Sequence, residues 1–391
     1  MTEDKVEEAQ AVGEGQSLGA GAGSVDPNEE LDLLTEEEED DLTAADHQIQ
    51  PVVYSGQDFD VAGLVGRLER GDVLVPTFGH QDARIISRGF QRSFVWSRRQ
   101  MDRFVESLLL GYPIPGIFLV RQADKRYLVL DGQQRLSTLR DFVSGIHAGK
   151  EFVLKNVADR FVGLTYKSLP EDFRRVFNDT FIQATIVASD GSPASLDSIY
   201  KIFERLNSGG TQLTPHEIRV ALYAGELVDF IEALNSNEQW RQLYGKRSKR
   251  IRDQELVLRI IALYSSAVTY SRPLKSFLNR FAGEHRDLRT LNKGLVTSRF
   301  TQATAMLVQG PGPAAFRHGS GQVNAALAEA TSVGLMRRLD SGTSPTSSAV
   351  RAAAERLAQD DNFSKAVSRA TADEEQVRKR LEIATAAFAG A

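Results

Sequence analysis

Short apolar runs and helical periodicities alternate along the first half of this chain. One set of apolar residues recurs at three- and four-residue intervals before Gly71 and predicts a helix there: Val61, Leu64, Val65 and Leu68. A second amphipathic helix is expected over residues 101–110, ending at Gly111. Four apolar runs have the length of buried strands: residues 73–75, 117–120, 128–130 and 181–187. This alternation predicts one mixed α/β domain.

From Ser195 onward the apolar pattern is helical. Thr214 supplies an N-cap, Pro215 the first helical position and Glu217 the acid of a capping box, so a helix begins there. Further helices are expected over residues 226–234, 254–264, 322–339, 348–359 and 374–387. The predicted fold class is therefore α+β, with a mixed α/β N-terminal domain followed by an all-helical C-terminal region.

The first 50 residues differ in composition from the rest of the chain. They hold 16 acidic residues and one lysine but no aromatic residue, which is typical of a disordered acidic tail. We expect the mixed α/β domain at residues 51–193, a helical region at 194–309 and a C-terminal helical extension at 310–391. Beyond residue 50 the chain carries 46 basic and 36 acidic side chains, a balance that allows attraction to nucleic acid or nucleotides.

Composition excludes several classes of site. Cysteine is absent, so there are no disulfides, thiol nucleophiles or thiolate metal ligands. No apolar run approaches the roughly 20 residues that span a bilayer, and the acidic N-terminus does not resemble a signal peptide. We therefore expect a cytoplasmic protein with no membrane partner. The segment HRDLRTLN at residues 285–292 matches a kinase catalytic loop, but the other kinase motifs do not accompany it in order.

The run YLVLDGQQRLST, residues 127–138, carries the main candidate chemistry, because a short apolar strand turns there directly into a helix. The first-turn amides and the helix dipole favour a phosphate at such a junction, and Arg135 can donate a bidentate fork. Asp131 repels phosphate unless Mg²⁺ or a water molecule to be activated lies between them. Alternatively, Asp131 merely caps the helix, and Gln133, Gln134 and Arg135 are solvated first-turn residues.

DGQQRLSTL resembles the signature of the GmrSD-type N-terminal domain, a ParB/sulfiredoxin-like nucleotide-binding module of bacterial restriction and anti-phage proteins. Further blocks match this family in order: FQRSFVW at residues 90–96, MDRFVESLLLGYPIP at 101–115, IFERLNSGG at 202–210 and TPHEIRVALYAG at 214–225. The resemblance extends from about residue 70 to residue 265 and places the nucleotide-binding domain at residues 51–193, with residues 194–309 completing the family domain. Ser93 departs from the family, which usually has proline there.

The resemblance implies a nucleoside triphosphate with Mg²⁺ as cofactor and assigns roles to individual residues. Asp131 is the expected catalytic residue, which holds Mg²⁺ or orients the attacking water. The expected nucleotide-binding residues are Arg92, Gly132, Gln133, Gln134, Arg135, Arg205 and Asn207. For Trp96, stacking on the base and packing in the core are both open, and Asn207 is alternatively a plain helix C-cap.

A basic cluster, KRSKRIR at residues 246–252, is the second candidate interface. Lys246, Arg247, Lys249 and Arg250 contact a nucleic-acid backbone in one interpretation and belong to a solvated loop in the other. The six histidines are scattered and form no His-Asn-His nuclease core, so we do not expect this chain alone to cleave DNA.

The sequence thus predicts an NTP-binding and NTP-hydrolysing protein that acts in bacterial defence against foreign or modified DNA. The alternative is a non-catalytic DNA-binding or adaptor module that is gated by nucleotide binding and works with a separate nuclease. Expected partners are the nucleotide, DNA and such a nuclease subunit, and the oligomeric state stays open.

Overall fold

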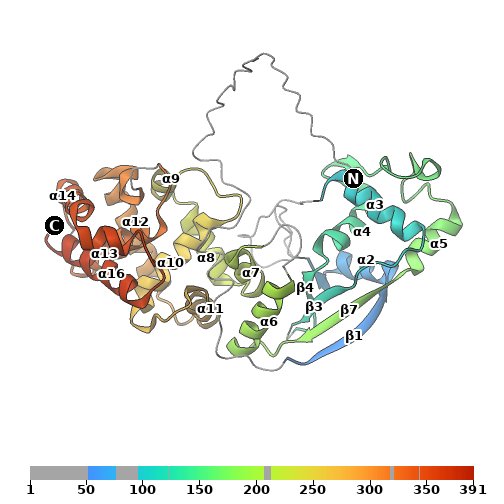
Figure 1. The fold of residues 1–391 in the computed structure, drawn as a ribbon, viewed down its shortest axis with the longest axis horizontal. Helices are drawn as coiled ribbons and strands as arrows, with labels where there is room; N and C mark the ends of the chain where they lie inside the picture. The colour runs from blue at the N-terminus through green and yellow to red at the C-terminus, as the bar shows by residue number, and fades with distance from the viewer. Residues whose placement is uncertain (1–51, 76–95, 123, 207–212, 318–320, 343) are drawn as a thin grey trace, which may run out of the picture.

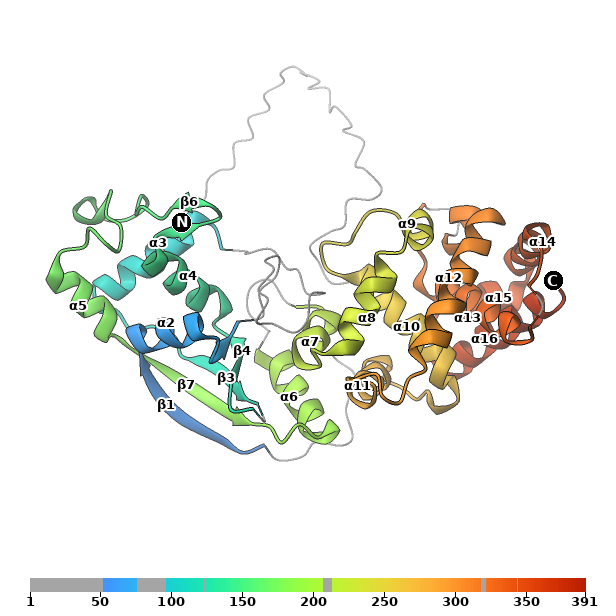
Figure 2. The ribbon, with the colours of Figure 1, turned by 180° about the vertical axis from the view of Figure 1, so that it is seen from behind.

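The computed structural model describes residues 52–75, 96–122, 124–206, 213–317, 321–342 and 344–391. The sheet and the helices packed on it lie at one end of the molecule, and α12 to α16 lie at the other (Figures 1 and 2). Helices α6 (Pro193–Leu206) and α7 (Pro215–Leu222) lie between these two parts.

A five-stranded mixed sheet forms the centre of the N-terminal part, in the strand order β1-β7-β3-β4-β2. Its strands are β1 (Tyr54–Asp60), β2 (Val73–Leu74), β3 (Ile117–Arg121), β4 (Tyr127–Asp131) and β7 (Phe181–Ala188). The β1–β7 and β3–β4 pairs are antiparallel, whereas β3–β7 and β2–β4 are parallel. Strands β5 (Ile146–His147) and β6 (Lys150–Glu151) form a separate hairpin.

The two-residue period of the central strands divides their side chains between two hydrophobic cores. Ile117, Leu119 and Val129 pack with the helices that cover one face of the sheet. These helices are α2 (Val61–Arg70), α3 (Arg98–Leu109), α4 (Gln133–Ser144) and α5 (Glu171–Asp179). The side chains on the other face belong to the core of the helical part: Val120, Leu128, Leu130 and Val187. Helix α6 contacts β4 on this side, so the sheet belongs to both parts.

The helical part continues with α8 (Glu226–Asn235), α9 (Glu238–Tyr244), α10 (Arg252–Ser266), α11 (Leu274–Glu284), α12 (Lys293–Gln309), α13 (Ala325–Asp340), α14 (Ser347–Gln359), α15 (Asp361–Ala366) and α16 (Glu374–Ala389). Residues 253–263 of α10 and 326–336 of α13 are buried throughout, so these two helices form its centre. Short 3₁₀ turns lie at Asp159–Phe161, Ala267–Thr269 and Gly312–Phe316.

The predicted α+β class is confirmed, and so are the local signals that predicted helix ends. Helix α2 ends at Gly71 with φ 78°. Thr214 and Glu217 form the predicted capping box. The predicted domain boundaries and the ParB/sulfiredoxin-like topology stay predictions, and the acidic tail lies outside the described residues.

Strand β1 was not expected, since a helix was the first element that the sequence predicted. Its residues Tyr54 to Asp58 are exposed, and Gly56 interrupts them, so no alternation reveals the strand. Helices α5, α9, α11, α12 and α15 were likewise not predicted.

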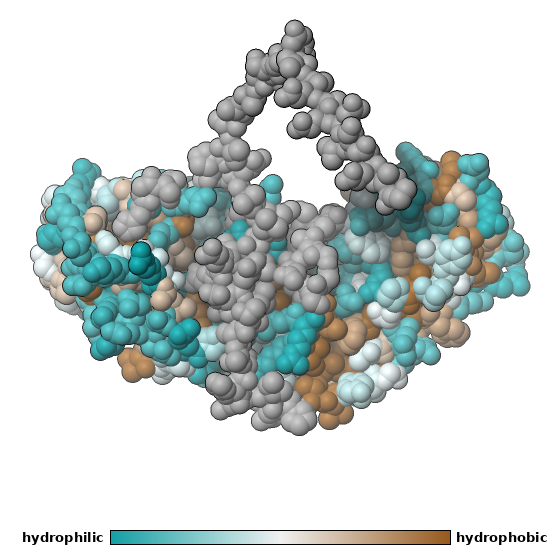
Figure 3. Space-filling model, viewed as in Figure 1, coloured by the Kyte–Doolittle hydropathy of each residue, from teal (hydrophilic) through white to brown (hydrophobic). Residues whose placement is uncertain are grey.

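The described surface seen in Figure 3 is mostly hydrophilic, with hydrophobic residues in several separate patches. Within the described residues, no helix is both long and apolar enough to cross a membrane.

Candidate functional site

The junction between β4 and α4 is built on a close backbone approach at Gly132. This residue has φ 95°, and a Cβ atom placed on it would lie 2.5 Å from Cγ2 of Ile117. Glycine is therefore required both for its backbone conformation and for lack of space. As the N-cap residue it supplies no side-chain hydrogen bond, so the interpretation of Asp131 as the helix cap is wrong. The Leu136 N–H donates to the Gly132 carbonyl over 2.9 Å, and the amides before Leu136 point out of the helix N-terminus.

Arg135 holds this junction together from inside. Its Nη2 donates to Oδ2 of Asp131 over 2.8 Å, and its Nη1 donates to the carbonyl of Gly116 over 2.9 Å and to that of Pro115. The Arg135 side chain is 11% exposed, whereas that of Asp131 is 50% exposed. Arg135 is therefore not a solvated first-turn residue, and its guanidinium is bound to the turn between α3 and β3. Asp131 presents part of its carboxylate to solvent.

Gln134 joins a third segment to the same place. Its Oε1 accepts a hydrogen bond from the Trp96 backbone N–H over 3.1 Å, across 38 positions of sequence. The Trp96 ring packs edge-on against Phe104 with 5.5 Å between the ring centroids, which favours its interpretation as a core aromatic. The side-chain amide nitrogen of Gln133, Nε2, lies 3.5 Å from the Val129 carbonyl oxygen within the same strand–helix unit. Hydrogen bonds from residues 131–135 thus connect the β4–α4 unit with the backbone at Trp96 and with the turn before β3.

The structure places the other predicted nucleotide-binding residues as follows. Arg205 is exposed in the last turn of α6. Its neighbour Glu204 lies against Lys275, with 3.3 Å between Nζ and Oε1, so Glu204 takes the buried side of this helix. Arg92 and Asn207 lie outside the described residues.

The basic cluster is divided between surface and core. Lys246, Arg247 and Lys249 are exposed, and Arg247 pairs with Glu232 over 2.6 Å. The Arg250 side chain, in contrast, is 3% exposed, and its Nη2 lies 3.0 Å from Oε2 of Glu217. In this structure Arg250 therefore anchors α7 instead of facing a nucleic acid. Contact of the three exposed residues with nucleic acid stays a prediction.

No group of three or more potential metal ligands is found among the residues that the structure describes. Asp131 would therefore share a Mg²⁺ ion with oxygen atoms of water and of a bound phosphate group. Mg²⁺ is usually bound in this way in nucleotide sites, by one or two carboxylates plus substrate phosphates. Asp131 would supply one carboxylate oxygen to an ion held in this way.

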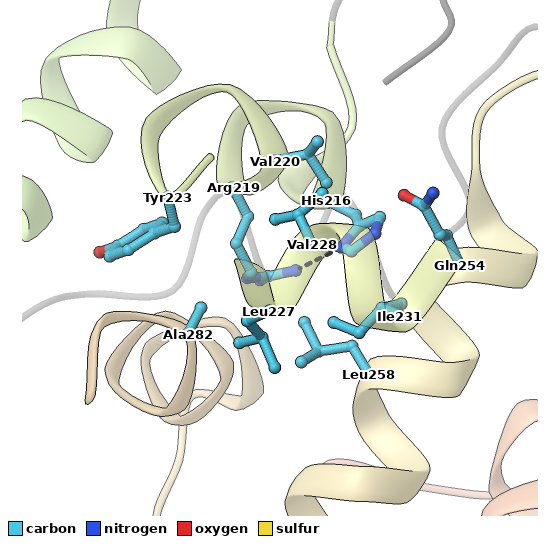
Figure 4. Close-up of a pocket in the computed structure, with 10 residues that line it drawn as sticks. All are labelled: His216, Arg219, Val220, Tyr223, Leu227, Val228, Ile231, Gln254, Leu258 and Ala282. Atoms are coloured by element: carbon cyan, nitrogen blue, oxygen red, sulfur yellow. Dashed lines mark hydrogen bonds between the residues drawn. The ribbon is translucent and has the colours of Figure 1, made fainter. Parts of the chain in front are cut away.

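A small cavity lies in the helical part, between α7, α8, α10 and α11 (Figure 4). It has room for about one water molecule and is far too small for a nucleotide. The His216 and Arg219 side chains lie on its wall, and Arg219 Nη1 lies 3.2 Å from Nδ1 of His216. Burial and the neighbouring guanidinium lower the pKa of His216 well below its usual value. His216 is therefore neutral in the folded protein.

A comparison with protein families shows which known domain the segment around this junction resembles. Residues 77–224 match the family model described as GmrSD restriction endonuclease, N-terminal domain. This segment is therefore similar to GmrSD N-terminal domains. The match includes α3, β3, β4 and α4, whose residues form the junction, and it ends after α7. The chain matches no curated protein and no solved structure. The GmrSD N-terminal domain supports a defence-related role for the chain.

The Pro115 and Gly116 carbonyls are a part of the site that was not predicted from the sequence. The Gly-Tyr-Pro-Ile-Pro block marked the turn, but no local signal indicated that Arg135 binds its backbone. A contact across 19 or 20 positions depends on strand pairing, which places the start of β3 beside the end of β4.

The Gly132→Ala substitution tests the steric constraint at the junction. We expect it to lower the free energy of unfolding by about 2–4 kcal/mol, because a strained φ and an overpacked Cβ act together. The matched control is Gly149→Ala, at φ 74° with no atom within 4 Å of the added Cβ. That variant should lose only about 1 kcal/mol in urea denaturation. Equal losses in the two variants would contradict the steric argument.

The buried His216 predicts a pH dependence of stability. Because its pKa is lowered in the folded state, the unfolded state binds more protons below pH of about 6.5, and stability falls as the pH decreases. This group contributes a slope of up to about 1.4 kcal/mol per pH unit. Urea denaturation of wild type and His216→Asn between pH 5 and 7.5 measures it. The slope of the free energy of unfolding against pH should be smaller in the variant. Parallel curves for the two proteins would contradict a lowered pKa of His216.

Proposed function

We propose that this protein binds a nucleoside triphosphate with Mg²⁺ at the β4–α4 junction and hydrolyses it, in defence against foreign or modified DNA. The observation that carries the proposal is the half-exposed Asp131 carboxylate beside the outward-pointing first-turn amides of α4. An anion is favoured at a helix N-terminus, and a carboxylate there suits a ligand that brings its own cation. The family of residues 77–224 agrees with a role in defence.

Each residue of the junction has a role in this proposal. The amides that follow Gly132, at Gln133 and Gln134, contact the phosphates, with the Arg135 charge behind them. Asp131 orients the attacking water or helps to hold Mg²⁺. Arg92, Arg205 and Asn207 complete the pocket. A bound Mg²⁺ ion would supply neutralisation of phosphate charge, and positioning with charge neutralisation is most of what phosphoryl transfer requires.

A second candidate function is a non-catalytic module in which nucleotide binding only controls contact with DNA or with a separate nuclease subunit. The Asp131–Arg135 ion pair favours it, since the guanidinium lies 2.8 Å from Oδ2 and so occupies an oxygen that would otherwise bind an attacking water. In both candidates the nucleotide state would reach the helical part through α6, which packs on β4. Direct DNA cleavage is not part of the proposal.

The Asp131→Asn variant tests catalysis. Phosphate release with ATP, GTP, CTP and UTP plus Mg²⁺, with and without DNA, should fall by roughly 100-fold or more in this variant. Nucleotide affinity should stay similar or increase, because the substitution removes a negative charge near the phosphates.

The matched control is Asp124→Asn, which removes a carboxylate of similar exposure from an ion pair with Arg126 between β3 and β4. That variant should keep wild-type turnover. Absence of turnover by the wild type with every nucleotide would overturn the catalytic proposal and favour the binding module.

A double variant tests the basic cluster as a DNA contact. Lys246→Ala with Lys249→Ala should weaken binding to duplex DNA and reduce the slope of log affinity against log salt by about 2. Fluorescence anisotropy between 50 and 200 mM salt measures both quantities. An unchanged slope would exclude these lysines from the interface.

A further inference from the structure

Both terminal nitrogens of Arg135 are bound by the protein itself, which conflicts with a bidentate phosphate clamp through Nη1 and Nη2. Its two terminal nitrogens donate three hydrogen bonds. Two are accepted by consecutive backbone carbonyls before β3, and the third is accepted by the Asp131 carboxylate. A guanidinium donates in a planar and rigid fork, so these contacts fix its orientation. Turning this fork toward a phosphate would break all three contacts and leave carbonyl groups of the turn without a donor.

The charge of Arg135 has a separate effect on the site. Asp131 and the phosphates of a nucleotide are both negative, and they repel each other at this junction. The guanidinium lies 2.8 Å from the Asp131 carboxylate and is 11% exposed, so it offsets that charge permanently from the protein side. The exposed half of Asp131 can still interact with a metal ion that accompanies the ligand.

We infer that Arg135 is a positioning residue and the fixed internal counter-ion of Asp131, and not a phosphate ligand. This inference rests on the proposed function and deepens it. Arg135 fixes the Pro115–Gly116 turn and the Asp131 side chain, and its charge allows polyphosphate to approach even without a metal ion. The dependence of ligand binding on Mg²⁺ is therefore set by Arg135.

The inference and a direct phosphate contact predict different binding data. Calorimetric titration would use inorganic tripolyphosphate, ATP and GTP, each with excess Mg²⁺ and with EDTA. Without the counter-ion, Arg135→Gln leaves Asp131 uncompensated, which weakens metal-free binding and preserves or strengthens binding with Mg²⁺. We expect the ratio of the two dissociation constants, EDTA over Mg²⁺, to increase about fivefold or more. Arg135→Lys keeps the charge and should keep the ratio near that of the wild type.

A matched control is Arg140→Gln, which removes one positive charge from the same helix and leaves residues 115 and 116 untouched. Arg140 pairs with Asp141 over 3.0 Å on α4. Its ratio should equal that of the wild type. If Arg135→Gln weakens binding equally with Mg²⁺ and with EDTA, Arg135 is a phosphate ligand and the inference is overturned. Dissociation constants that are unchanged in both conditions overturn the counter-ion role as well.

Hydrogen exchange tests the positioning role without any ligand. The amides of residues 116–118 should exchange faster in both Arg135 variants than in Arg140→Gln, since neither replacement reproduces the pair of carbonyl contacts. Unchanged exchange would overturn this role. If the wild type binds no nucleotide and no tripolyphosphate, the proposed function fails and the counter-ion role fails with it. The exchange data still decide the positioning role in that case.

Discussion

The architecture of the candidate site depends on how closely α4 begins beside β3. Only a residue without Cβ fits between the end of β4 and Ile117, and the backbone there adopts φ 95°. The same close approach brings the Arg135 side chain within reach of the Pro115 and Gly116 carbonyls. It also leaves the helix without a side-chain cap at Gly132. One steric constraint thus determines the backbone geometry, the position of the internal arginine and the uncapped start of the helix.

Local signals in the sequence predicted much of the fold. The helix end at Gly71 and the helix start at Thr214 were predictable because capping depends on residues within one helical turn. Strand β1 was not, because its polar residues form a strand only through their pairing with β7. The pairing with β7, and not the local sequence pattern, therefore determines that these residues form a strand.

In the candidate site, too, local features were predictable and long-range contacts were not. The sequence located the strand–helix junction and its motif, since both are local. It did not indicate the partners of the side chains: Gln134 binds the backbone at Trp96, and Arg250 binds Glu217 in the core. Such contacts span 38 and 33 positions, and only the completed fold brings them together. A basic run in a sequence therefore does not distinguish a surface cation from a buried one.

The central strands also limit how this protein can be divided into fragments. Val120, Leu128, Leu130 and Val187 lie in the core that the sheet shares with the helices after residue 193. A fragment that ends near that position would expose these side chains together on one face of the sheet. Contiguous apolar surface of this kind promotes aggregation. Biochemical work on the junction therefore requires the helical part, even though residues 131–135 do not belong to it.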